Sequence, residues 1–363
     1  MIVNIGSKMK STRINIFGHL NHLGNQYEML KLAKNYPIKF WWLENNVRKW
    51  SKYAPRPRPE TWLTKDEFEW VTYYEKGKYD LAILHLDQQA ADPYIGKGQL
   101  CRQLENIIQD IPKIIFNHGT PMWDEMFTED MVINGGDILT DKGTRRIDGI
   151  KAIVKDNQMI VNSYAAVDRW GWGYPLIHGM DANEWWDLPK EPRVTISLSP
   201  GGLDKYYNRA LLTAIKAAVR EKTQLEVQHI MVNYKAQDWD DYRDFIGRSL
   251  IYINPTLDSP MPRSRTEAMF SGCCVLTSRH HNADEFIKQG VNGYILPDNP
   301  NSYAELIYEL IFNNYQKAVD VGRAGKATAK KLFTEKQYQE DLFSIICAVK
   351  DGKKLEWNGE KRW

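Results

Sequence analysis

Two arginines and a glutamate lie close together in the segment INPTLDSPMPRSRTEAMFSGCCVLTS, residues 253–278. Arg263 and Arg265 precede Glu267 within one turn, where a proline-rich loop is followed by a predicted helix and an apolar strand. The free N–H groups at a helix start attract anions, and arginines add bidentate donors for phosphate. Ser264 and Glu267 also fit S-x-x-E, a capping box that needs no ligand. The segment therefore predicts either a diphosphate site or a capped helix.

A second group of polar residues follows the predicted strands of the first half of the chain. His118 comes directly after the apolar run KIIFN, and ligands of parallel sheets bind outside the carboxyl ends of the strands. The other candidates for contacts with an acceptor are His19, His22, His85, Asp87 and Asp124. Asp124 also fits a helix cap. Each of these residues has an alternative structural role, so the pattern predicts an acceptor site without assigning every member to it.

Residues 45–62 alternate cations with aromatic rings and include Arg56 and Arg58. Such a mixture suits a phosphate-bearing acceptor, either nucleic acid or a lipid phosphate. The alternative is a solvated loop whose long side chains cover apolar surface. The chain as a whole is balanced, with 48 basic and 46 acidic residues, so any affinity for a polyanion must be local.

Metal, redox and targeting signals are weak. The run SRHHNADE, which ends at Glu285, fits no established spacing of metal ligands, so we expect no metal. The four cysteines have neither metal spacing nor a disulfide framework, which indicates a reducing compartment. The chain has no apolar run long enough for a signal peptide or a membrane span. These features predict a cytoplasmic protein, with peripheral membrane contact left open.

The elements that must position these residues follow a repeated strand–helix pattern, and a length of 363 residues favours two domains. Strands are predicted over 13–19, 38–44, 80–86, 113–119 and 159–163, and again over 193–199, 225–232, 249–255, 273–278 and 293–297. Helices are predicted over 25–35, 165–171, 208–222, 303–313 and 335–350. Residues 177–192 form the predicted break between the halves. Two doubly wound sheets that face each other predict a ligand cleft between their carboxyl edges.

The motif PTLDSPMPRSRTEAMFSGCCVLTS, followed by ADEFIKQGVNGYILP, resembles the signature of the GT-B glycosyltransferases of family 4. Weaker similarity extends over NSYAAVDRWGWGYPLIHGMDANEW and GRAGKATAKKLFTEKQYQEDLFSII. The resemblance implies an α/β GT-B fold of two facing Rossmann-like domains. These are an N-terminal acceptor domain over 1–180, a C-terminal donor domain over 181–335, and a helix over 336–363 that returns to the first domain.

The resemblance also implies roles for the donor-site residues. Glu267 matches the glutamate that binds the ribose hydroxyls, and Ser259 occupies the place of the family's first acidic residue, directly after Asp258. Lys205 matches a family lysine, but the neighbouring arginine is missing, so we expect Arg263 or Arg265 to supply that charge. The remaining donor-site candidates are Gly201, Gly202, Ser264 and Glu285. Gly201 and Gly202 allow a close approach of backbone to phosphate, or form a plain turn.

The implied function is transfer of a sugar from a nucleotide-diphosphate donor, with retention and without a catalytic metal or other cofactor. Lys205 and Arg263 would stabilise the leaving diphosphate, and His118 would contact the donor sugar. Three alternatives stay open. They are an enzyme that glycosylates modified DNA bases, a nucleotide-sugar epimerase of the same architecture, and a noncatalytic nucleic-acid-binding protein.

Overall fold

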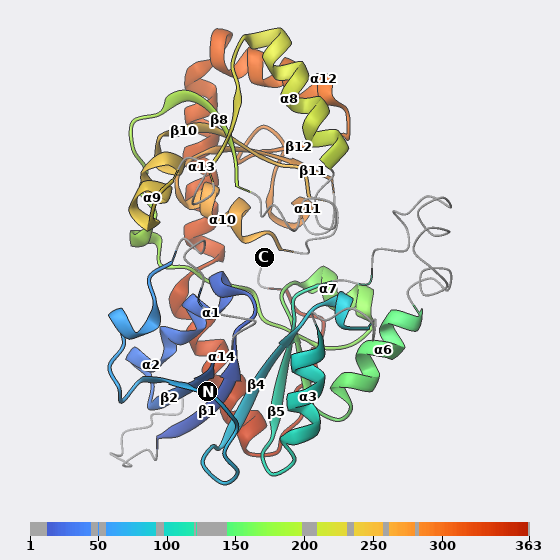
Figure 1. Ribbon diagram of the computed structural model, residues 1–363. Coiled ribbons are helices and arrows are strands. Elements are labelled where there is room, and N and C mark those ends of the chain that lie inside the picture. The colour runs from blue at the N-terminus through green and yellow to red at the C-terminus, as the bar shows by residue number, and fades with distance from the viewer. Residues whose placement is uncertain are drawn as a thin grey trace.

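The apolar runs of the first half form one parallel sheet in the computed structural model (Figure 1). Its seven strands have the order β3-β2-β1-β4-β5-β6-β7. Their bounds are β1 Ile14–His19, β2 Ile38–Leu43, β3 Phe68–Val71, β4 Leu81–Leu86, β5 Lys113–Asn117, β6 Gln158–Val161 and β7 Tyr174–Pro175. All residues of β4, β5 and β6 are buried, as expected for central strands of a parallel sheet covered on both faces.

The structure describes residues 13–44, 50, 56–91, 98–119, 121, 144–197, 209–230, 236–256, 261–279 and 283–361. Six predicted site residues lie outside these ranges: Asp124, Gly201, Gly202, Lys205, Asp258 and Ser259.

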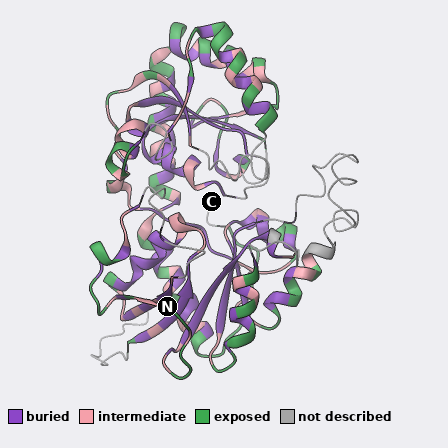
Figure 2. Ribbon diagram, in the orientation of Figure 1, coloured by how far each residue is buried: buried purple, intermediate pink, exposed green. Residues whose placement is uncertain are grey.

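The second half forms a parallel sheet of five strands in the order β12-β11-β10-β8-β9. Their bounds are β8 Glu191–Ile196, β9 Val227–His229, β10 Ser249–Asn254, β11 Cys274–Ser278 and β12 Tyr294–Leu296. Cys273 and Cys274 are free thiols with no exposed surface, which places them in the core as the apolar run around them predicts. In both halves the strands are buried and the outward faces of the helices are exposed (Figure 2).

Helices flank both sheets. Those of the N-terminal half are α1 Leu23–Leu30, α2 Leu32–Asn35, α3 Gln99–Ile107, α6 Thr144–Val154 and α7 Tyr164–Trp170. Those of the C-terminal half are α8 Arg209–Thr223, α9 Trp239–Arg248, α10 Arg263–Phe270, α11 Ala283–Phe286, α12 Pro300–Tyr308 and α13 Tyr315–Leu332. Helix α7 ends at Gly171, whose φ of 73° is the left-handed conformation that glycine adopts without strain.

The last helix, α14 (Glu335–Lys350), returns to the N-terminal half (Figure 1). Leu342 and Ile346 share one hydrophobic core with Ile16 and Phe40 of the N-terminal sheet. The predicted fold class, two facing doubly wound domains with a C-terminal helix that crosses back, is confirmed. Within the described ranges, no helix is long and apolar enough to span a bilayer.

The elements differ from the prediction in detail. The helix predicted over 25–35 is interrupted at Lys31 and forms α1 and α2. Strand β3 and helices α3, α6 and α9 are not among the predicted elements. The predicted break over 177–192 contains the connection from β7 to β8, and Met180 forms a β-bridge with Thr334 at the start of α14. The two crossings between the halves therefore lie side by side.

Candidate functional site

Helix α10 begins at the carboxyl edge of the C-terminal sheet and lies on the side of the N-terminal half (Figure 1). Its N-cap is Pro262, and no side chain caps the helix. Ser264 is therefore the second helical residue, and the capping-box interpretation of Ser264 and Glu267 is wrong. The Glu267 carboxylate has other partners.

Glu267 is held by one residue from each half of the molecule. Arg56 Nη2 donates to Glu267 Oε1 over 2.6 Å, and the Tyr242 hydroxyl donates to Glu267 Oε2 over 2.8 Å. The Arg56 guanidinium also stacks on Trp239, with its carbon 4.0 Å from the ring centroid. Only 6% of Glu267 is exposed. The glutamate expected to bind ribose is thus part of a buried ion pair across the two halves.

The surroundings keep Arg56 charged and Tyr242 protonated, so that both can donate hydrogen bonds to Glu267. Burial would lower the pKa of Arg56, but the carboxylates of Glu267 and Glu28 hold that pKa above its ordinary value. Burial and Glu267 together raise the pKa of the Tyr242 phenol well above its ordinary value. Arg56 therefore carries its charge, and Tyr242 retains the proton that it donates.

Arg263 also spans the two halves. Its Nη1 donates to Asn25 Oδ1 over 3.1 Å, and its Nη2 donates to Glu28 Oε1 over 3.1 Å. A Cβ at Gly24 would lie 3.0 Å from Arg263 Nε, so the glycine leaves room for this approach. Burial lowers the pKa of Arg263, while Glu28 and Glu267 act in the opposite direction. Arg263, the arginine expected to bind diphosphate, thus contacts α1 of the N-terminal half.

Arg265 and Glu285 are in different surroundings from Arg263. Arg265 has no exposed surface, and its guanidinium carbon lies 4.8 Å from the Phe286 ring centroid, inside the C-terminal half. Of the two candidates for the missing charge, Arg263 is therefore the one that faces the N-terminal half. Glu285 pairs with Lys361 of the C-terminal tail over 3.0 Å, and burial raises the pKa of Glu285. Ser264 is partly exposed on α10.

Four histidines from three separate segments of the chain meet at the carboxyl edge of the N-terminal sheet. His118 Nε2 and His85 Nδ1 are 3.0 Å apart, and the backbone N–H of His85 donates to His19 Nε2 over 3.0 Å. The rings of His22 and His118 have centroids 4.1 Å apart. Asn25 Nδ2 lies 2.9 Å from His118 Nδ1. Among the described residues no group of three or more histidine, cysteine, aspartate or glutamate side chains is placed to hold a metal.

The other acceptor candidates are split between the interior and the surface. Asp87 directly follows β4, two residues after His85 of the histidine cluster, and is 2% exposed. Arg58 is on the surface, where it contacts Glu60 and Glu44. Arg56 does not extend toward solvent as a basic patch requires, since its side chain is buried on Glu267. The rest of the basic aromatic stretch, apart from Trp50 and residues 57–62, lies outside the described residues.

Several residues that contact Glu267 and Arg263 are not among those predicted from the sequence. Asn25 and Glu28 lie one turn apart on α1, directly after strand β1, so the rule that ligands meet the carboxyl ends of strands applies to them as well. Tyr242 and Trp239 lie on α9, whose start is marked by Asp238 as an N-cap. That cap is the sequence signal by which α9 is recognisable.

A second charged cluster lies where the chain crosses between the halves. Lys31 Nζ contacts Glu28 Oε2 at 2.9 Å, Glu184 Oε2 at 2.8 Å and Glu335 Oε1 at 3.9 Å. Burial raises the pKa of Glu335 to about 6, although Lys31 lowers it. Glu28 thus pairs both with Arg263 of α10 and with Lys31, which lies between α1 and α2.

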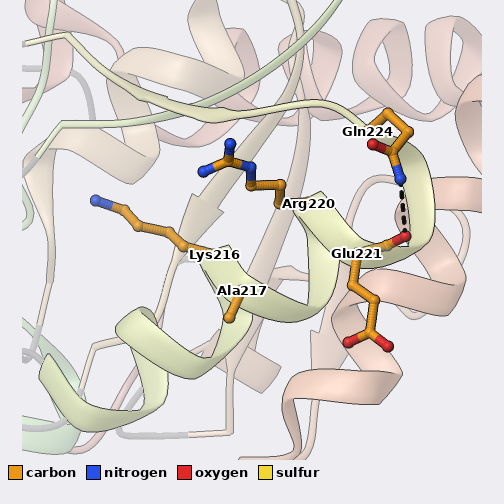
Figure 3. A pocket seen from close by; sticks show the side chains of 5 residues that line it. All are labelled: Lys216, Ala217, Arg220, Glu221 and Gln224. Carbon is orange, nitrogen blue, oxygen red and sulfur yellow. Dashed lines mark hydrogen bonds between the residues drawn. The ribbon is translucent and has the colours of Figure 1, made fainter.

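The hollow drawn in Figure 3 is not part of this arrangement. It lies along α8 and is lined by Lys216, Ala217, Arg220, Glu221 and Gln224. Most of these residues are exposed, and the Gln224 amide donates to the backbone of Glu221. It is a surface depression on the outer helix layer of the C-terminal half.

Comparison with known proteins agrees with this geometry. Residues 215–328 match the family Glycosyl transferases group 1, and this range contains α10. The predicted resemblance to glycosyltransferases is confirmed, and this part of the chain is similar to a glycosyltransferase domain. A curated relative, spore coat protein SA of Bacillus subtilis (strain 168), is 34% identical over 88 residues, which are 24% of this chain and 23% of that protein.

Solved structures share the fold over nearly the whole chain. Sucrose-phosphate synthase from Thermosynechococcus elongatus has a TM-score of 0.65 at 12% identity, covering 94% of this chain and 100% of its own. Anabaena Alr3699/HepE in complex with UDP and glucose has a TM-score of 0.61 at 14% identity, covering 93% of this chain and 100% of its own. The architecture is therefore GT-B.

Proposed function

We propose that the protein transfers a sugar from a nucleotide-diphosphate donor to an acceptor hydroxyl. One observation carries this proposal: through Arg263, α10 contacts Asn25 and Glu28 of α1, the helix that follows strand β1 at the carboxyl edge of the N-terminal sheet. A donor held by α10 and an acceptor held beside the histidine cluster would meet between these two edges. The solved structures of Alr3699/HepE in complex with UDP and glucose and with UDP-glucose give the class of donor for a test.

The donor site in this proposal is centred on Glu267. A carboxylate accepts two ribose hydroxyls well, but Arg56 and Tyr242 now each donate to one oxygen of Glu267, and the carboxylate is buried between them. Ribose therefore reaches Glu267 after Arg56 withdraws with the N-terminal half, so donor binding is coupled to separation of the halves. Arg263 and the first N–H groups of α10 would then face the diphosphate. Further donor contacts assigned to Lys205 and residues 258–259 stay predictions.

The proposed reaction depends on positioning and charge. The acceptor oxygen forms a bond to the anomeric carbon on the face from which the diphosphate oxygen departs, and the acceptor proton passes to the departing diphosphate. Arg263 and helix N–H groups stabilise the charge that develops there, which is the kind of contribution that raises transfer rates. His118 contacts the donor sugar. Retention and independence from metal or other cofactors are part of this proposal.

Two groups of residues bear on the kind of acceptor, the basic aromatic stretch and the histidine cluster. The basic aromatic stretch motivates an acceptor with phosphates, including DNA with modified bases, but Arg56 and Arg58 are engaged within the molecule. The histidine cluster offers neutral hydrogen-bonding groups instead. We therefore place the acceptor hydroxyl beside this cluster. A nucleic-acid acceptor is one of the acceptors to be tested in the experiments below.

The test is a thermal-shift screen of the protein against sugar conjugates of UDP, GDP, ADP and TDP. A ligand that binds the folded state raises the unfolding temperature by mass action. We expect one conjugate to stabilise the protein and Glu267→Gln to remove that shift. Glu60→Gln, which changes an exposed glutamate paired with Arg58, is the matched control and should respond like the parent.

Incubation of the stabilising conjugate without an acceptor separates the alternatives. Conversion to an epimer would support the epimerase, whereas slow hydrolysis or no product is expected for a transferase. Transfer to hydroxymethylated DNA would support the DNA-modifying enzyme. The absence of any shift, together with salt-dependent binding to DNA, would overturn the proposal in favour of a nucleic-acid-binding protein.

A further inference from the structure

Three side chains connect the C-terminal half to the histidine cluster. Arg263 Nη1 donates to Asn25 Oδ1 over 3.1 Å, and Asn25 Nδ2 lies 2.9 Å from His118 Nδ1. Asn25 belongs to α1 and is partly exposed, whereas His118 is 9% exposed. The amide of Asn25 thus bridges the arginine on one half and the imidazole on the other.

The chemistry of arginine decides which way this amide points. A guanidinium has donors and no acceptor, so the group that faces Arg263 must be the amide oxygen. The NH₂ group of Asn25 then faces Nδ1 of His118, which must accept and carries no proton. A neutral imidazole has one N–H, so the proton of His118 is on Nε2. The direction of one hydrogen bond from α10 therefore sets the tautomer of His118.

The neighbouring histidines fit the same assignment. The Nε2–H of His118 can donate to His85 Nδ1, 3.0 Å away. Independently, the backbone N–H of His85 donates to His19 Nε2, which leaves the proton of His19 on Nδ1, 3.1 Å from the carbonyl of Leu20. Each contact pairs a donor with an acceptor when all three histidines are neutral.

A second proton on His118 conflicts with this arrangement. The new Nδ1–H would face the NH₂ group of Asn25, and turning the amide over would direct that NH₂ group at Arg263. The charged and titratable groups around His118 are His22 and His85 of the cluster, and Arg263 with Glu28 beyond Asn25. Glu28 is already bonded by Arg263 and Lys31, so it is not directed at the imidazole.

We propose that Asn25 is a positioning residue that holds His118 neutral with its proton on Nε2, in a state set by the docking of Arg263. Its role in catalysis rests on the proposed glycosyl transfer. There, His118 stays uncharged, and the positive charge at the diphosphate comes from Arg263. Withdrawal of Arg263 releases the Asn25 amide, so the tautomer of His118 reports whether the two halves are engaged.

The test is nuclear magnetic resonance of the full chain with ¹⁵N-labelled histidine, because protonated and unprotonated ring nitrogens have different ¹⁵N shifts. His118→Gln assigns the signals. We expect an unprotonated Nδ1 and a protonated Nε2 in the parent. Asn25→Asp puts a carboxylate, whose two oxygens both accept, between Arg263 and His118. His118 should then carry a proton on Nδ1, which it donates to this carboxylate. Arg263→Leu frees the amide to turn, and the His118 signals should show both tautomers.

Asn162→Asp is the matched control, since Asn162 contacts the backbone oxygen of His118 and not its ring. It should leave the parent tautomer in place. A parent His118 with its proton on Nδ1, or an unchanged tautomer in Asn25→Asp, would overturn the inference. Donor binding is measured separately by titration calorimetry. If no nucleotide sugar binds while the tautomers are as expected, the proposed function fails and this inference stands.

Discussion

At the scale of single residues, the contact between Arg56 and Glu267 has consequences for stability as well as for binding. Both side chains are buried, at 2% and 8% exposure. Removing one member of a buried pair leaves the other charge without compensation in a poorly solvated place. Glu267 therefore cannot be truncated without affecting the fold, and a binding experiment needs the shape-conserving change to glutamine.

We predict that Glu267→Ala lowers the free energy of unfolding by about 3–5 kcal/mol, because Arg56 stays buried without its partner. Glu60→Ala breaks the exposed contact with Arg58 and should cost at most about 1 kcal/mol. Urea titrations followed by circular dichroism measure both values. Equal losses in the two variants would show that the Arg56–Glu267 pair is not buried as described.

At the scale of elements, helix α13 packs against the turn that follows α10 through a glycine. A Cβ at Gly322 would lie 2.2 Å from the backbone oxygen of Gly272, far closer than real contacts allow. Alanine is normally the better helix former by about 1 kcal/mol, so propensity and packing make opposite predictions here.

We predict that Gly322→Ala destabilises the protein by about 1–3 kcal/mol, because the clash with backbone outweighs the gain in propensity. Ala327→Gly, on the exposed face of the same helix, should lose about 1 kcal/mol from propensity alone. Thermal unfolding of both variants is the measurement. A more stable Gly322→Ala variant would contradict the packing of α13 on α10.

The start of α14 gives a pH-dependent prediction. The pKa of Glu335 is raised from 4.5 to about 6, so the folded state holds this proton more tightly than the unfolded chain. Its favourable contribution is present below about pH 4.5 and is lost as the pH rises through 6. Lys31 opposes the shift, and Glu28, Asp181 and Glu184 reinforce it.

We expect Glu335→Gln to raise the free energy of unfolding by about 1 kcal/mol near pH 8 and to change it little near pH 4.5. Glu340→Gln, more exposed on the same helix, is the matched control. Urea titrations at the two pH values decide. A loss of stability at the higher pH would mean that the contact with Lys31 outweighs burial.

Some helices and strands were predictable from local sequence patterns, and others were not. Strands β4, β5 and β11 and helices α8 and α14 were predictable because continuous apolar runs or a strong helical period define them. Strand β3 reads FEWV, which is too short and mixed to be recognised. Helix α1 ends one residue before Lys31, whose side chain binds Glu28 and Glu184, so a tertiary charge cluster coincides with the interruption of a continuous helical pattern.

The candidate site was predictable where it depends on strand ends. His19, His85 and His118 lie at the carboxyl ends of three neighbouring strands, and the carboxyl-edge rule brings them together. The partners across the two halves were not predictable, because no local pattern says how two domains face each other. Arg56 was assigned to a phosphate-binding loop and binds Glu267, and Arg265 was a candidate for the diphosphate and is buried.

At the scale of the whole molecule, charged contacts and one paired crossing of the chain join the two halves in the part of the chain that the structure describes. Arg56 binds Glu267, Arg263 binds Glu28, and Lys31 joins Glu28 to Glu184 and Glu335 near the Met180–Thr334 bridge. Donor binding at Glu267, as proposed, would compete with the first of these contacts. The molecule described here is thus the engaged state, with the donor glutamate covered by the other half.

The central claim is that Glu267 of α10 binds the nucleotide of a sugar donor. Its most direct test is titration calorimetry of UDP-glucose and the other nucleotide sugars into the parent, Glu267→Gln and the control Glu60→Gln, with circular dichroism to show that each is folded. We predict that one donor binds the parent and the control equally, and binds Glu267→Gln at least about tenfold more weakly. Equal donor affinity in folded Glu267→Gln would contradict the claim.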